Sequence, residues 1–77
     1  MKIEDAQRGN LVQVDRLITT AGLLVGPGLI KNRRADARGI VLRGDPANCI
    51  VWVKHGGTVA PYWDSELVLI GVVDPEG

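Results

Sequence analysis

The chain lacks the cross-links on which many small folds depend. Cys49 is its only cysteine and His55 its only histidine, so neither an intrachain disulfide nor a cysteine–histidine metal site can form. We accordingly expect no metal and no cofactor. A chain of 77 residues makes a single domain, residues 1–77, and buries only about 60% of its unfolded surface. Because such a core is marginal, we expect additional support from other copies in a homo-oligomer.

Net charge and long apolar runs are also missing. Nine basic residues balance nine acidic ones, which argues against a chain-wide basic surface for nucleic acid. No stretch is long enough to cross a bilayer, and the first ten residues resemble no signal peptide. We therefore expect no membrane contact and, with one free thiol, a cytoplasmic location. The charges are nevertheless segregated, because no Lys or Arg follows Lys54.

Short apolar runs separated by Gly, Pro, Asn and Asp predict an all-β fold. In the first run Val12 and Val14 alternate with polar neighbours, which is typical of a strand with one buried face. The runs predict five strands, at residues 11–15, 38–43, 49–54, 58–62 and 68–73. Residues 63–67 predict one helical turn before the last strand, with Asp64 or Ser65 as its cap.

A long apolar excursion separates the first two predicted strands. Residues 17–30 are too often interrupted by Gly and Pro to form one regular helix. Their aliphatic content exceeds what a small barrel needs, and exposed patches of this kind commonly mark an interface. The predicted oligomer interface comprises Leu23, Leu24, Val25, Leu29 and Ile30. A loop folded over the mouth of the barrel explains the same residues, and both interpretations stay open.

The order of these elements resembles the SH3-like barrels, including the Tudor and KOW domains. The opening turn Arg8-Gly9-Asn10-Leu11-Val12, the stretch 39–41 and the stretch 50–53 match the pattern of such barrels. Residues 57–62 and 65–70 are similar to their fourth strand, single 3₁₀ turn and last strand. The resemblance implies a five-stranded SH3-like barrel with a long loop between strands 1 and 2. Short barrels of this sort are common among phage and mobile-cassette proteins, and we favour that origin.

The last hairpin is also distantly similar to the plasmid-encoded type II dihydrofolate reductases. In that family the corresponding strand lines a pore shared between subunits, and Val59 and Tyr62 match its pattern. A ligand-contacting glutamine of the family is replaced here by Ala60, and an isoleucine by Pro61. The resemblance therefore implies assembly through strand edges but predicts no reductase activity.

Two groups of side chains are candidates for binding a partner. Strand alternation places Trp52 on the face opposite Val51 and Val53, so its ring is predicted to face outward with Tyr62 near it. The second group is the basic loop Arg33, Arg34 and Arg38, which either contacts phosphates or keeps a small protein solvated.

No catalytic constellation is evident. His55 follows a strand in a glycine turn without a neighbouring nucleophile, which predicts an exposed turn histidine. Cys49 opens an apolar strand and is expected to be a small buried hydrophobe. Glu66 is expected to be solvated on its helical turn. We therefore predict that the chain is not an enzyme.

The leading hypothesis is a binding and assembly module that self-associates and binds a macromolecular partner, a protein in the first instance. The alternative is a nucleic-acid-binding domain of the Tudor or KOW kind that stacks bases on Trp52 or Tyr62. A third hypothesis, which the resemblance alone supplies, is an oligomeric reductase-like enzyme with a pore site at Tyr62.

Overall fold

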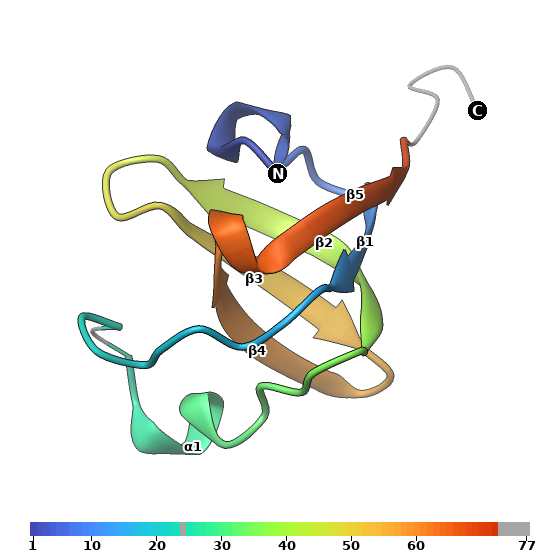
Figure 1. The fold of residues 1–77 in the computed structure, drawn as a ribbon. Coiled ribbons are helices and arrows are strands. Elements are labelled where there is room, and N and C mark those ends of the chain that lie inside the picture. Colours follow the sequence, from blue (N-terminus) through green and yellow to red (C-terminus); the bar gives the residue numbers. More distant parts are fainter. Residues whose placement is uncertain (24, 73–77) are drawn as a thin grey trace.

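Five antiparallel strands form one strongly curved sheet (Figure 1). The computed structural model describes residues 1–23 and 25–72. The strands are β1 (Leu11–Val14), β2 (Arg38–Asp45), β3 (Ile50–His55), β4 (Thr58–Trp63) and β5 (Leu67–Gly71). The helical elements are the 3₁₀ turns η1 (Ile3–Asp5) and η2 (Asp64–Glu66) and the single turn α1 (Pro27–Ile30).

The sheet has the order β4-β3-β2-β1-β5, so β4 and β5 lie at its two edges. The all-β prediction is confirmed, together with the long segment between the first two strands and the 3₁₀ turn before the last one. The predicted closure is not observed, because no ladder joins the edge strands β4 and β5 and the sheet is not closed into a barrel. The last predicted strand begins one residue earlier than expected, and its end at position 73 lies outside the described residues.

The core lies on the concave face of the sheet and follows strand alternation. Every strand contributes to it, and β1, β3 and β4 contribute alternate side chains, since successive residues of a strand point to opposite faces. The core consists of Ala6, Val12, Val14, Val41, Val51, Val53, Ala60, Tyr62 and Leu67, none of them more than 8% exposed. β-Branched valines dominate because they suit a pleated surface and lose little rotamer freedom there.

Gly39 allows β2 to approach β3 closely. A Cβ at this position would lie 2.5 Å from a methyl carbon of Val53 and 2.6 Å from the backbone oxygen of Lys54. Neither distance is sterically possible, and a backbone atom cannot rotate away. Glycine is therefore required at this crossing of the two strands.

The turn between β2 and β3 differs from the prediction. β2 continues to Asp45, and Cys49 occupies the turn with a φ of 57° instead of opening β3. Its side chain is exposed, so the prediction of a buried Cys49 is wrong. Cys49 thus adopts a left-handed backbone conformation at the end of the tight turn. This conformation is uncommon, but not forbidden, for a residue other than glycine.

The apolar excursion is only partly covered: Leu17 and Ile18 are 42% and 51% exposed, whereas the described residues of the predicted interface are more buried. α1 packs against β4, and Figure 1 shows it on the side of the molecule away from both termini. Leu23 is only 6% exposed, while Val25, Leu29 and Ile30 are half-buried. Leu24 lies outside the described residues. The interpretation as a covering loop thus fits the described part of this set better than an open interface does.

Candidate functional site

A groove lies beside Trp52 on the described surface. It has a volume of about 380 Å³ and is lined by Arg8, Leu42, Arg43, Trp52 and Val59. Three neighbouring strands contribute to it, and it opens on the face of the sheet opposite the core. Trp52 therefore lies on the outer face, as its alternation with Val51 and Val53 predicts.

An irregularity in β2 creates one wall of the groove. Val41 pairs with Val53, whereas Arg43 pairs with Trp52, so Leu42 is an extra residue without a partner in β3. Such a β-bulge re-aims side chains locally. In a regular strand Leu42 and Arg43 would point to opposite faces, yet here both line the same groove. The bulge thus adds an aliphatic side chain and a cation beside one indole ring.

A hydrogen-bonded turn positions Arg8 near the bulge. Gly9 has a φ of 94°, a conformation that glycine adopts without strain. Its N–H donates to the backbone oxygen of Val41 at 2.8 Å, and the N–H of Val41 donates to Asn10 O at 2.9 Å. These bonds fix the segment before β1 against β2, immediately next to the bulged residue. Arg8 consequently forms the second cationic wall.

The groove is cationic without local compensation. No acidic residue lines it, and within the described residues neither Arg8 nor Arg43 forms an ion pair. The Arg43 guanidinium lies over the indole of Trp52, 5.5 Å from the ring centroid. This cation–π contact is worth about 0.5–1 kcal/mol at an exposed site and orients the guanidinium towards the groove.

Tyr62 and Arg33 are interior residues and do not belong to this surface. Tyr62 has no exposed area and Arg33 only 8%, which corrects their assignment as surface contacts for a partner. The Tyr62 hydroxyl accepts a hydrogen bond from the backbone N–H of Arg34 and bonds to His55 Nε2, both at 2.9 Å. His55 is therefore a half-buried partner of Tyr62, not the freely exposed turn residue that was predicted. Burial raises the pKa of Tyr62 above its ordinary value.

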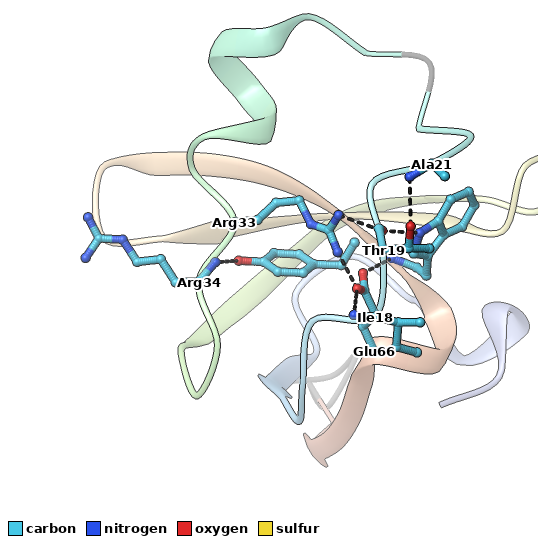
Figure 2. Close-up of polar contacts among 8 residues, drawn as sticks. Ile18, Thr19, Ala21, Arg33, Arg34 and Glu66 are labelled. Carbon is cyan, nitrogen blue, oxygen red and sulfur yellow. Dashed lines mark hydrogen bonds and ion pairs between the residues drawn. The ribbon is translucent and has the colours of Figure 1, made fainter.

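Arg33 is neutralised by Glu66, a residue whose role the sequence did not reveal. The two side chains form a buried ion pair (Figure 2). Glu66 also accepts hydrogen bonds from the backbone N–H groups of Ile18 at 2.7 Å and Trp63 at 2.8 Å. The second bond is half of a capping box, so Glu66, and neither Asp64 nor Ser65, caps η2. The prediction of a solvated Glu66 is wrong, because 0% of it is exposed.

The other two loop arginines remain accessible but lie apart. Arg34 and Arg38 are exposed, and Arg38 opens β2 opposite Gln13 of β1. Neither lines the groove beside Trp52. The structure therefore separates the five predicted partner-binding residues: Trp52 at the groove, Arg34 and Arg38 elsewhere on the surface, and Arg33 and Tyr62 inside.

A second surface is aliphatic. Four outward side chains of β1, β2 and β5 are between 36% and 46% exposed, namely Leu11, Ile40, Val68 and Ile70, here called the aliphatic strip. Leu11 pairs directly with Ile40, and Val68 lies on the neighbouring strand opposite Gln13. The strip thus runs across three adjacent strands and ends at the edge strand β5, where the Met1 ammonium donates a hydrogen bond to the backbone oxygen of Leu67 at 2.7 Å.

The fold and these surfaces define a small all-β protein with an aromatic, cationic groove. No known protein family, curated protein or solved structure matches this chain. In the described ranges no group of three His, Cys, Asp or Glu side chains is placed to hold a metal. None of the helices described there has the length and apolarity needed to cross a bilayer.

Proposed function

We propose that this chain is a non-enzymatic binding and assembly module, of the SH3-like kind that its sequence resembles. It binds an anionic macromolecular partner through the groove beside Trp52. The observation that supports this proposal is the pair of arginines that line one groove with the Trp52 indole, where no carboxylate lines the groove and neither arginine forms an ion pair within the described residues. Trp and Arg are the residue types most enriched where partner contacts contribute most to binding.

Self-association is the second part of the proposed function. The aliphatic strip and the edge position of β5 support it, because an exposed apolar edge strand is a template for pairing with another chain. A cytoplasmic location, suggested by the exposed thiol of Cys49, completes the proposal. The reductase-like alternative is not favoured, because a Tyr62 with no exposed area cannot line a pore.

The groove is tested by following the two indole N–H signals in nuclear magnetic resonance spectra during titration with anionic polymers. We expect polyglutamate or an oligonucleotide to shift the Trp52 signal. The Trp63 signal serves as an internal reference, since its Nε1–H donates to Thr19 O at 2.8 Å away from the groove. Arg43→Gln should move the titration to higher polymer concentration, whereas Arg16→Gln, which changes an exposed arginine outside the groove, should leave it unchanged. A Trp52 signal that responds to none of these polymers would contradict the proposal.

A further inference from the structure

The walls of the groove indicate the shape of what enters it. Leu42 and Val59 contribute aliphatic surface on either side of Trp52. A volume of about 380 Å³ is at the small end of ligand sites, which span roughly 300–1,000 Å³. One large apolar side chain with its adjoining backbone suits such a space, and the rest of an extended partner would lie across the sheet surface.

The charges around the groove indicate what flanks that side chain. Arg8 and Arg43 each present a planar, forked set of donors that matches a carboxylate in two-point contact. Lys54 adds a third cation: it is exposed, lies on the same face of β3 as Trp52, and pairs in register with Val59. The nearest acidic residue along β2 is Asp45, the last residue of the strand, which accepts a hydrogen bond from Asn48.

A stacked nucleobase fits this arrangement less well. The guanidinium of Arg43 already covers the indole of Trp52, so a base would have to displace it to stack on that face. Proteins that bind single strands combine open aromatic platforms with an excess of positive charge, whereas this chain has a net charge of zero. By contrast, carboxylates can contact the guanidinium groups, and an aliphatic side chain can pack between Leu42 and Val59, without displacing Arg43 from the indole.

From this geometry we infer that the groove binds an acidic peptide segment of a protein partner. One aliphatic side chain enters between Leu42 and Val59, and carboxylates on either side of it contact Arg8, Arg43 and Lys54. The inference rests on the proposed function and specifies its partner.

The test uses the full chain and four probes. The first is a fluorescent peptide with one central leucine between aspartate and glutamate residues. The second replaces the leucine with alanine, and the third replaces every carboxylate with its amide. The fourth is a single-stranded oligonucleotide of similar length. Fluorescence polarisation measures affinity, and the Trp52 indole signal locates the binding site.

We expect the acidic leucine peptide to shift the Trp52 signal and to bind about tenfold more tightly than the alanine peptide, since a buried leucine side chain contributes on that scale. The amide peptide should not bind. Arg43→Gln should weaken binding of the acidic peptide about fivefold, and the matched control Arg16→Gln should leave it unchanged.

Four results overturn the inference. Equal binding of the acidic and amide peptides removes the role of charge, and equal binding of the leucine and alanine peptides removes the apolar anchor. If the oligonucleotide alone shifts the Trp52 signal, the groove remains a binding site as proposed, but its partner is a nucleic acid. If no probe shifts that signal at millimolar concentration, the proposed function fails together with the inference.

Discussion

Arg33 and Glu66 form a buried ion pair that attaches the long loop to the 3₁₀ turn before β5. Arg33 also donates to the backbone oxygen of Thr19 at 3.0 Å and lies over the ring of Tyr62, 5.6 Å from its centroid. The carboxylate of Glu66 receives two backbone N–H groups in addition. A loop of more than twenty residues without a strand is thus held at both ends by one pair of charges.

Removing either charge should destabilise the chain strongly. Arg33→Met leaves the Glu66 carboxylate buried without its cation, and Glu66→Gln leaves a buried guanidinium unpaired; each costs about 3–5 kcal/mol. The double variant should lose less than the sum of the two single variants, because no uncompensated charge remains. Urea unfolding measures all three, with Lys31→Met, an exposed cation of the same loop, as a control expected within about 0.5 kcal/mol of the parent. Additive losses would show that the two charges act independently.

The single tyrosine gives a direct pH test of burial. Because the folded pKa of Tyr62 is raised above about 10, protonated Tyr62 favours the folded chain. Its contribution is fully present below pH 10 and is lost as the pH rises through the raised folded value. Tyrosinate absorbance should therefore appear at higher pH in the folded chain than in concentrated urea. Arg33→Met should raise the folded pKa further, since that cation favours the phenolate. Identical titrations in the two states would contradict the buried position.

Strand content was predictable because alternation is a local property of the sequence. The valines at 12, 14, 51 and 53 repeat every second residue, and all four are buried. The same alternation correctly predicted that Trp52 lies on the outer face of β3, opposite Val51 and Val53. The bulge at Leu42 did not, because an extra residue becomes visible only when the partner strand and its register are known.

The buried ion pair, the cap by Glu66 and the position of Cys49 could not be predicted from the sequence for different reasons. Arg33 and Glu66 are 33 positions apart, and a cluster of cations in a loop normally indicates a solvated segment. The capping relation of Glu66 to Trp63 lacked its usual marker, a Ser, Thr, Asp or Asn at the cap position. Cys49 was misplaced because its left-handed φ of 57° is uncommon for a non-glycine residue. Only the ion pair thus depends on an element far along the chain, whereas the cap and the turn are local features whose residue types give no clear signal.

Gly39→Ala should be among the most destabilising single-methyl additions in the chain. The new Cβ would lie 2.6 Å from the oxygen of Lys54, so β2 and β3 would have to separate at the centre of the sheet. We expect a loss of about 1–3 kcal/mol, the range for overpacked cores. Gly28→Ala is the matched control: its Cβ would meet no atom within 4 Å, and alanine favours the helical conformation of α1. Equal melting temperatures for the two variants would show that the close approach at Gly39 is relieved at little cost.

Self-association should depend on the aliphatic strip and not on the long loop between β1 and β2. In an antiparallel pairing of β5 with β5 of a second copy, two identical apolar strands meet across a two-fold axis and extend the sheet. Val68 and Ile70 would then leave water together with their counterparts, whereas lysine at an edge strand opposes such pairing. We expect light scattering to give a mass above that of one chain at micromolar concentration, and Val68→Lys with Ile70→Lys to reduce it to one chain. Leu17→Lys is the control, because Leu17 is similarly exposed, at 42%, but lies on the long loop outside the strip. A parent chain that stays monomeric at high micromolar concentration would remove self-association from the proposed function, and loss of the oligomer only in Leu17→Lys would transfer the interface to the loop.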